Sequence, residues 1–347
     1  MSTMKGIVKV DRVKGAVWAE DLPIPKPGPR DVLVKVRAAA ICGTDLHIYG
    51  WTPWAESRIV PPMVFGHEFA GDIVEAGPGV RRLKVGQRIA GETHIDCGKC
   101  YQCLTGNAHI CEDMKIVGVH VPGAFAEYIV IPETCGWEIA DGVSYEQGAI
   151  LEPMGVAMHG IEASGGVGGR SVVILGCGPI GLMAIGIAKA QGADPIIVSD
   201  RVDAKLSVAE AMGATTTVNV AKQDLPSVVM SATGKRGADI VIDYSGNGRA
   251  ISDGLKSLKK GGRMVLVGLP DGPVSLDLSD GIIYKEATLV GVTGRTMYGT
   301  WFECERLLNS GKIDLSLVIG GRYDMRDFDA AFNAIYGGAP GKMLLVP

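Results

Sequence analysis

An uncharged stretch at residues 171–188 most constrains the fold of this chain, since eighteen apolar or small residues follow one another there. A run of that length matches a membrane-spanning helix. Four residues near its start would interrupt a continuous helix: Gly176, Gly178, Pro179 and Gly181. The stretch therefore predicts a buried strand at 172–175, a glycine-rich turn, and an apolar helix that ends near residue 190.

Strands and helices continue to alternate after this stretch. Further strands are expected at 196–198, 215–218, 240–242 and 264–267, with helices near 204–212 and 249–258. This alternation predicts an α/β fold with a doubly wound parallel sheet. From residue 298 the pattern changes to two helices and a last strand at 343–346.

The first half of the chain has a different pattern of apolar residues. Short runs of period two at 32–37, 72–75 and 128–131 are separated by clusters of glycine and proline. That pattern predicts a β-rich domain whose loops carry the polar residues. The length of 347 residues also favours two domains.

Composition excludes several classes of protein. The net charge is −4, and no basic run is longer than a pair of residues, which disfavours a nucleic-acid surface. The N-terminus has no long apolar core of the secretion-signal type. We expect a cytoplasmic enzyme with a small-molecule substrate, without a nucleic-acid or membrane partner.

Four cysteines in fifteen residues predict a structural metal site. Two, two and seven residues separate them, a spacing typical of tetrahedral Zn²⁺ bound by sulfur: Cys97, Cys100, Cys103 and Cys111. A disulfide framework is disfavoured in a chain of this length with its own apolar core. Four sulfurs fill the coordination sphere, so substrate must bind elsewhere.

A second, mixed set of ligands lies upstream. Cys42, His67 and Glu68 offer a thiolate, an imidazole and a carboxylate, and a catalytic zinc takes about three such ligands and keeps one position open. Each residue alone has a simpler interpretation, since a lone cysteine or histidine after an apolar run is usually part of the core.

The order CGTD, GHE, CxxCxxCx₇C and GxGxxG resembles the zinc-dependent medium-chain dehydrogenases over nearly the whole chain. The resemblance implies a β-rich GroES-like catalytic domain with a zinc lobe, and a Rossmann domain. It implies that the catalytic domain spans residues 1–153 and 298–347 and that the NAD-binding domain spans 154–297.

Within that family, several stretches are similar to the threonine-oxidising members. They are CGTDLHIY at 42–49, PPMVFGHE at 61–68, GETH at 91–94 and GRTM at 294–297. The resemblance implies oxidation of the secondary hydroxyl of L-threonine to 2-amino-3-ketobutyrate, with hydride transfer to NAD.

The same resemblance assigns roles around the open zinc. Thr44 and His47 would carry the proton away, and Glu152 would lie near the metal as an exchangeable ligand or part of the proton path. His94 would contact the substrate. Simpler interpretations are a turn-capping hydroxyl for Thr44, a surface acid for Glu152 and a residue that orients the cysteine lobe for His94.

The glycine-rich turn is suited to a dinucleotide, because backbone N–H groups and a helix N-terminus approach the pyrophosphate there. Asp200, nineteen residues after Gly181, would accept hydrogen bonds from the ribose and repel a 2′-phosphate, which favours NAD over NADP despite Arg201 beside it. With the family pattern, the expected cofactor residues are Gly176, Gly178, Ile180, Gly181, Asp200, Lys205, Val267, Gly268, Leu269, Val292 and Thr293.

Two alternatives remain open at this stage. Val156 follows Gly155 where the threonine-oxidising members usually carry asparagine. The segment that begins at Val156 is more similar to polyol, sorbitol or 2,3-butanediol dehydrogenases, so the first alternative is such an enzyme with the same zinc and NAD. A non-catalytic nucleotide-binding scaffold is the alternative of another class. The family also implies a homotetramer, for which the strand expected at 288–292 would be a pairing edge.

Overall fold

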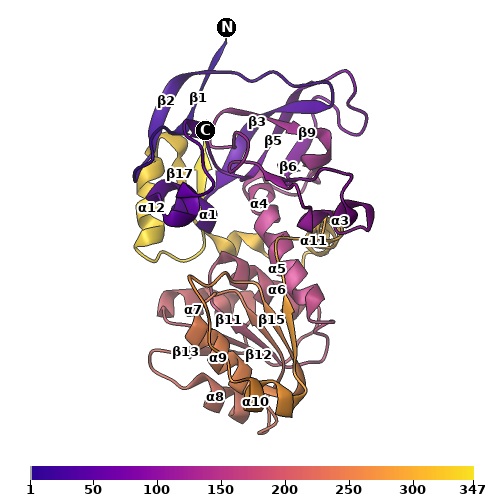
Figure 1. Ribbon diagram of the computed structural model, residues 1–347, viewed down its shortest axis with the longest axis vertical. Coiled ribbons are helices and arrows are strands. Elements are labelled where there is room, and N and C mark those ends of the chain that lie inside the picture. The colour runs from indigo at the N-terminus through magenta and orange to yellow at the C-terminus, as the bar shows by residue number, and fades with distance from the viewer. Residues whose placement is uncertain (1) are drawn as a thin grey trace. The chain divides into compact units, whose positions relative to one another are not determined.

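The computed structural model describes residues 2–347, which divide into two compact units. The first unit comprises Met1–Glu152 and Ile319–Pro347, and the second comprises Pro153–Val318. In Figure 1 the first unit contains both the indigo N-terminal strands and the yellow C-terminal segment. The chain therefore leaves the first unit and returns to it.

The first unit is built mainly from short strands. Its strands are β1 (Thr3–Lys9), β2 (Val17–Pro23), β3 (Asp31–Ala40), β4 (Met63–Val64), β5 (Glu68–Ala76), β6 (Arg88–Gly91), β7 (His94–Ile95), β8 (Lys115–Ile116), β9 (Tyr128–Pro132), β10 (Gly136–Glu138), β17 (Ile319–Asp324) and β18 (Lys342–Val346). Its helices are α1 (Gly43–Gly50), α2 (Pro53–Glu56), α3 (Tyr101–Leu104), α4 (Tyr145–Ala149) and α12 (Phe328–Tyr336), with 3₁₀ turns at Ala108–Ile110, Glu133–Cys135 and Met325–Asp327.

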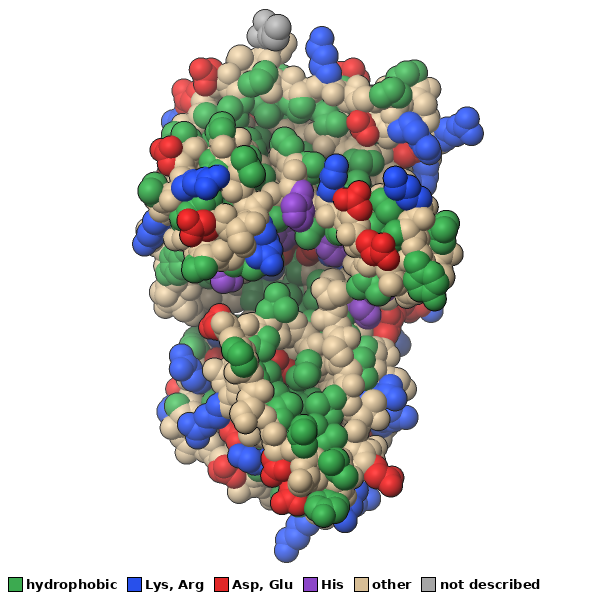
Figure 2. All heavy atoms as spheres, viewed as in Figure 1, with side chains coloured by type: hydrophobic (Ala, Val, Ile, Leu, Met, Phe, Trp, Pro, Cys, Tyr) green, Lys and Arg blue, Asp and Glu red, His purple; other side chains and the backbone are tan. Residues whose placement is uncertain are grey.

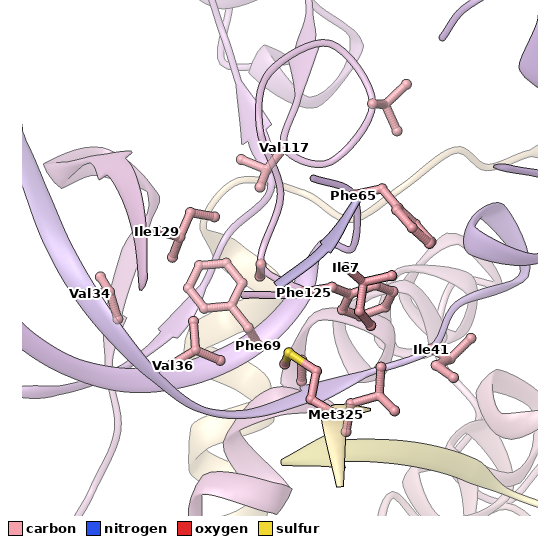
Figure 3. Close-up of a cluster of buried hydrophobic side chains, with 14 of the residues drawn as sticks. Ile7, Val34, Val36, Ile41, Phe65, Phe69, Val117, Phe125, Ile129 and Met325 are labelled. Carbon is pink, nitrogen blue, oxygen red and sulfur yellow. The ribbon is translucent and has the colours of Figure 1, made fainter. Parts of the chain in front are cut away.

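The main sheet of this unit runs in the order β10-β6-β5-β3-β18-β17, and β9 also pairs with β3. Its alternating apolar side chains pack against a cluster in which Phe69, Phe125 and Met325 lie together (Figure 3). All three are essentially inaccessible to solvent. This core holds loops from distant parts of the chain in fixed positions.

Strand register decides which loop residues meet. Ala40, at the end of β3, pairs with Glu68 at the start of antiparallel β5. On its other side Ala40 pairs with Leu344 of β18. The loop after β3, the loop before β5 and the start of β18 are therefore neighbours, although about 300 residues of sequence separate β3 from β18.

The second unit contains the alternating elements. They are α5 (Leu151–Ala163, whose first two residues belong to the first unit), β11 (Val172–Leu175), α6 (Pro179–Ala190), β12 (Ile196–Asp200), α7 (Asp203–Met212), β13 (Thr216–Asn219), α8 (Leu225–Ala232), β14 (Ala238–Asp243), α9 (Gly248–Ser257), β15 (Leu258–Leu266), α10 (Leu278–Gly281), β16 (Thr288–Gly291) and α11 (Gly299–Asn309), with 3₁₀ turns at Ile283–Lys285 and Leu315–Val318.

These strands form a six-stranded parallel sheet in the order β13-β12-β11-β14-β15-β16. Consecutive strands are added outward from β11 on one side and then, from β14, on the other. This is the doubly wound arrangement predicted from the sequence, and the strand order reverses between β11 and β14. Ligands of such sheets bind at that reversal, beyond the carboxyl ends of the strands.

The boundary of the second unit differs from the predicted one. Residues 298–318, expected in the first domain, lie in the second unit. The reason is packing: buried Ile313 lies against Gly186 of α6, and buried Cys304 lies near Glu162 of α5. The sequence pattern also did not predict α8 or β17 as separate elements.

The surface carries both signs of charge. On the face shown in Figure 2, acidic and basic side chains are interspersed over both units. Within residues 2–347, no helix has the length and apolar character needed to cross a lipid bilayer. The uncharged stretch instead forms β11 and the buried face of α6.

Candidate metal centres and dinucleotide site

Three of the predicted ligands meet where β3 ends and β5 begins. The ligand atoms of Cys42, His67 and Glu68 all lie within 4.8 Å of one another. Glu68 is fully buried, His67 nearly so and Cys42 half-buried. One sulfur, one nitrogen and one carboxylate oxygen at this spacing suit Zn²⁺ with a fourth position left for another ligand.

Asp45 lies behind two of these residues. One carboxylate oxygen accepts the backbone N–H of Cys42 at 2.8 Å, and the other lies 3.6 Å from Nδ1 of His67. Among the described residues, neither Oδ1 of Asp45 nor Nδ1 of His67 has a hydrogen-bond partner, although both atoms are buried. A carboxylate in this position orients a metal-binding imidazole.

The electrostatics of this centre favour a cation. Burial raises the pKa of Asp45. Burial alone would lower the pKa of His67, but the charges of Asp45 and Cys42 outweigh it and raise that pKa to about 10. The negative surroundings therefore stabilise positive charge at His67, whether a proton or a metal ion supplies it.

Lys342 enters the same centre from β18. Its Nζ contacts both oxygens of Glu68, one of them at 2.6 Å, and donates to the carbonyl of Ile41 at 3.1 Å. Burial raises the pKa of Glu68 to about 6, Lys342 opposes this rise, and Glu152 adds to it. Glu152 is thus close enough to act on the metal-binding group electrostatically.

Glu152 is buried in the first turn of α5. The hydroxyl of Thr93 donates to its Oε1 at 3.3 Å. The next residue, His94, is half-buried, and its backbone N–H donates to Oε1 of buried Glu92 at 2.8 Å. The segment at 91–94 therefore brings His94 and Glu152 to the same part of the first unit.

Thr44 and His47 lie on α1, which begins directly after Cys42. They are three residues apart and so share a helix face. Thr44 is half-buried, whereas His47 is exposed. Nδ1 of His47 lies 3.1 Å from the hydroxyl oxygen of Thr52, and the imidazole lies beside the ring of Trp54, with centroids 5.8 Å apart. These neighbours fix the orientation of the imidazole.

The four-cysteine lobe has the geometry of a closed metal site. Sγ of Cys100 lies 3.4 Å from Sγ of Cys103 and 3.9 Å from Sγ of Cys111, and Cys97 belongs to the same group. Tetrahedral Zn–S bonds of about 2.3 Å place sulfurs about 3.8 Å apart. All four thiols are free of disulfide bonds.

The thiols of this lobe respond differently to their surroundings. Backbone N–H groups of Cys103 and Glu112 lower the pKa of Cys100 to about 6, whereas desolvation raises the pKa of Cys103 to about 12. Four thiolates so close together need a cation to stabilise them. The residues present therefore fit a structural Zn²⁺.

The glycine-rich turn joins β11 to α6 in the second unit. Gly176 has a φ of +93°, and a Cβ on Gly181 would lie 2.0 Å from the carbonyl oxygen of Gly176. Only glycine fits at these two positions. Gly178 is the N-cap of α6 and Pro179 follows as its first residue, which leaves the N–H groups of the first turn directed at this end of the sheet.

Asp200 ends β12 and lies beside this turn. Its carboxylate accepts the N–H of Cys177 at 2.9 Å, of Arg201 at 2.7 Å and of Val202 at 3.0 Å. Burial first, and then the charge of Asp200, raises the pKa of the Cys177 thiol, while Lys205 opposes the rise. The structure thus brings Asp200 and Lys205 to the glycine turn.

The remaining predicted cofactor residues follow the carboxyl ends of neighbouring strands. The N–H groups of Val267 and Gly268 bond to the carbonyl of Asp243, and the N–H of Val292 bonds to that of Leu266. Leu269 and Thr293 are exposed next to them, and Ile180 is half-buried in the first turn of α6. All of them lie at the carboxyl ends of the parallel strands, where the glycine turn after β11 also lies.

Several residues of these sites were not predicted. Asp45 and Thr93 lie inside the sequence motifs CGTD and GETH, but the sequence analysis assigned no function to either residue. Asp243, fully buried at the end of β14, holds the next turn by accepting the N–H of Ser245 and of Gly246 at 3.0 Å each. Lys342 gave no local signal, because its partner Glu68 is 274 residues away.

Two families match the chain. Residues 179–310 match the zinc-binding dehydrogenases, and residues 28–141 match the GroES-like domain of alcohol dehydrogenases. These segments fall in the second and first units respectively.

Individual relatives extend over the whole length. An L-threonine 3-dehydrogenase of Caldanaerobacter subterraneus subsp. tengcongensis is 45% identical over 345 residues, which cover 99% of each chain. Galactitol-1-phosphate dehydrogenase of Escherichia coli superimposes with a TM-score of 0.92 at 28% identity, covering 99% of this chain and 100% of that one. For 2R,3R-butanediol dehydrogenase of Bacillus subtilis the TM-score is 0.90, again at 28% identity, with 99% of this chain and 100% of that chain covered.

Proposed function

The chain belongs to the zinc-binding alcohol dehydrogenases, and on this basis we propose that it oxidises the secondary hydroxyl of L-threonine to 2-amino-3-ketobutyrate and transfers the hydride to NAD. The observation that carries the reaction type is the open, mixed group of Cys42, His67 and Glu68. A non-catalytic nucleotide-binding scaffold has no need of an open metal site, so the scaffold alternative is disfavoured.

Cys42, His67 and Glu68 would hold the catalytic Zn²⁺, which acts as a Lewis acid toward the substrate hydroxyl when bound. Asp45 would hold the imidazole of His67 in place and keep the backbone of Cys42 fixed. The four cysteines of the lobe would hold a second, structural Zn²⁺.

Thr44 and His47 would move the hydroxyl proton to solvent. Thr44 lies two residues after the ligand Cys42, and its half-buried hydroxyl can pass a proton along the helix face toward exposed His47. An imidazole suits the last step because its ordinary pKa is near neutrality. Thr52 supports the path by holding the ring of His47.

Glu152 and His94 are proposed to recognise the charged groups of an amino-acid substrate. A zwitterion needs partners for an ammonium and a carboxylate, because burying either charge unpaired costs several kcal/mol. Glu152, buried and held by Thr93, would face the ammonium, and half-buried His94 would donate to the carboxylate. Glu152 would alternatively serve as an exchangeable ligand or a proton carrier.

NAD is favoured over NADP by Asp200. A carboxylate beside the glycine turn would accept hydrogen bonds from the ribose and repel a 2′-phosphate. Arg201, exposed beside it, is a group that would attract such a phosphate. The residues following β15 and β16 would line the rest of the dinucleotide, with the second unit as the NAD-binding domain.

The substrate proposal rests on sequence identity. The threonine dehydrogenase relative shares 45% of its residues with the chain, against 28% for the butanediol dehydrogenase. A polyol or butanediol substrate remains the second candidate because of Val156. His159, which belongs to the same polyol-like segment, donates through Nδ1 to the carbonyl of Gly294 at 3.1 Å. That contact gives His159 a structural role independent of substrate.

We propose a cytoplasmic homotetramer on the basis of the family resemblance. Strand β16 is at the edge of the six-stranded sheet, with its outer side available to a second copy. Exposed Ile283 and Tyr284 lie just before it and would be covered by such pairing. The free cysteines suit a reducing compartment.

The direct test is NADH formation by the zinc-loaded enzyme on L-threonine. We expect turnover that disappears in His67→Ala while the variant keeps its native circular dichroism spectrum. Absence of NADH formation by the zinc-loaded wild-type enzyme would overturn the proposed substrate, and full activity of His67→Ala would overturn the proposed metal centre.

A further inference from the structure

Lys342 is a buried cation that contacts both oxygens of the proposed metal ligand Glu68. Its side chain is 4% exposed and that of Glu68 is not exposed at all. Its ammonium has three N–H donors, and Nζ donates to Oε1 of Glu68, to Oε2 of Glu68 and to the carbonyl of Ile41, the residue before Cys42. One ammonium therefore contacts the segments that carry all three ligands.

We propose that Lys342 is a positioning residue that sets how strongly Glu68 binds the metal, because it shares the Glu68 carboxylate with the metal and compensates its charge when the metal leaves. The inference rests on Glu68 belonging to the metal centre and does not depend on the substrate. It concerns a contact that a local sequence motif cannot contain, since 274 residues separate the two side chains.

The sign of the effect follows from charge. Neighbouring carboxylates make a ligand a stronger donor, whereas a cation bound to both oxygens of a carboxylate withdraws electron density and makes it a weaker one. Removing the charge of Lys342 should therefore strengthen the bond between Glu68 and the metal. Without the metal, the same change removes the ammonium that contacts both oxygens of a fully buried carboxylate, and the imidazole of His67 is the cation left near it. Losing the bonded partner of a buried charge is strongly destabilising.

Lys342 also sets the net charge of the centre. The thiolate of Cys42 and the carboxylates of Asp45, Glu68 and Glu152 supply four negative charges, against three positive charges from Zn²⁺ and Lys342. The ammonium of Lys342 contacts both oxygens of Glu68 and donates to the carbonyl of Ile41. Its loss makes the centre more negative and hence more retentive of a divalent cation.

The chain offers a matched control in Lys9. This lysine is also fully buried, but its Nζ donates to neutral carbonyls, those of Val13, Gly15 at 2.8 Å and Tyr49 at 3.4 Å. Lys9→Met removes a buried ammonium without leaving a carboxylate uncompensated. A purely structural role for Lys342 predicts that Lys342→Met and Lys9→Met behave alike.

The experiment compares thermal unfolding of the full chain with Zn²⁺ and after metal removal, and the rate of zinc release to a chromogenic chelator. In Lys342→Met we expect the metal-free form to lose more stability than the zinc form, so that the gap between their melting temperatures widens by several degrees. Zinc should leave the mixed site about tenfold more slowly, while release from the four-cysteine lobe stays unchanged. Lys342→Arg should restore wild-type behaviour.

Equal losses in both metal states, as expected for Lys9→Met, or faster zinc release in Lys342→Met would overturn the proposal. If Lys342→Met does not fold without metal, the double variant Glu68→Gln/Lys342→Met decides, because it has no uncompensated carboxylate. We expect it to fold in the metal-free state. A double variant as unstable as the single one would equally overturn the proposal.

Discussion

Asp45 places one carboxylate oxygen 2.8 Å from the backbone nitrogen of Cys42 and the other 3.6 Å from Nδ1 of His67. One buried side chain thus links the two metal-binding segments, which come from the end of β3 and the start of β5. Its role should be visible in metal affinity.

Replacing Asp45 with asparagine should weaken zinc binding at the mixed site by roughly 10–100-fold, or about 1.4–2.7 kcal/mol, because the imidazole of His67 loses its anionic partner. The isosteric amide can still accept the N–H of Cys42, so the fold should persist. Competition with a chelator of known affinity measures the effect. Wild-type affinity in the variant would show that Asp45 contributes only through its hydrogen bond with the N–H of Cys42.

The two proposed zinc ions should have separable roles. Cys100→Ser should lower the melting temperature by several degrees and reduce soluble yield, because it removes a ligand of the closed lobe. His67→Ala should abolish turnover with the fold retained. Metal analysis should give two zinc ions per chain in the wild type and about one in each variant, and a fully active protein with one zinc would contradict this scheme.

The four-cysteine set could be predicted because it is local, with short fixed spacings in one segment. The mixed set comes from two segments, at Cys42 and at His67–Glu68, and was predicted from short motifs whose order resembles the zinc-dependent dehydrogenases. The sequence also predicted the strand–turn–helix at 172–190, where glycines can be read directly as backbone requirements. It did not predict the contact of Lys342 with Glu68 or the support that Thr93 gives Glu152, because both depend on pairing between distant strands and loops. Propensity alone likewise gave no basis for assigning residues 298–318 to the second unit, which depends on the packing of Ile313.

Asp200→Gly should weaken NAD use and improve NADP use, because the repulsion of a 2′-phosphate disappears while Arg201 remains. The carboxylate also holds the N–H groups of Cys177, Arg201 and Val202, so Asp200→Asn is the matched variant that removes charge but keeps an acceptor. The ratio of kcat/KM for the two dinucleotides should shift toward NADP in both. A wild-type enzyme that uses both equally well would refute the role given to Asp200.

Acid stability of the second unit should depend on Asp239. Partial burial works to raise its pKa, but Lys259 and the N–H and hydroxyl of Ser171 outweigh it and lower that pKa to about 2. A depressed carboxylate stabilises the fold above its unfolded pKa of about 3.9 and loses that contribution as pH falls toward 2.

Asp239→Asn should therefore lower the free energy of unfolding by about 1 kcal/mol at pH 7, allowing for solvent screening, and the difference from wild type should shrink below pH 4. Denaturant titration at several pH values measures this. Asp203→Asn, which removes an exposed pair with Lys222, is the control and should have the smaller effect. A deficit in Asp239→Asn that stays constant down to pH 3 would mean that ionisation of Asp239 does not contribute.

The proposal that the substrate is L-threonine is tested most directly by kcat/KM for L-threonine and 2,3-butanediol, measured with NAD on the wild-type enzyme and on His94→Ala. We predict that the wild type prefers L-threonine by tenfold or more. His94→Ala should raise the KM for L-threonine by roughly tenfold, the loss of one charge-assisted hydrogen bond, and leave diol turnover nearly unchanged. A wild-type enzyme with higher kcat/KM for 2,3-butanediol would contradict the account and make Val156 the better guide to its substrate.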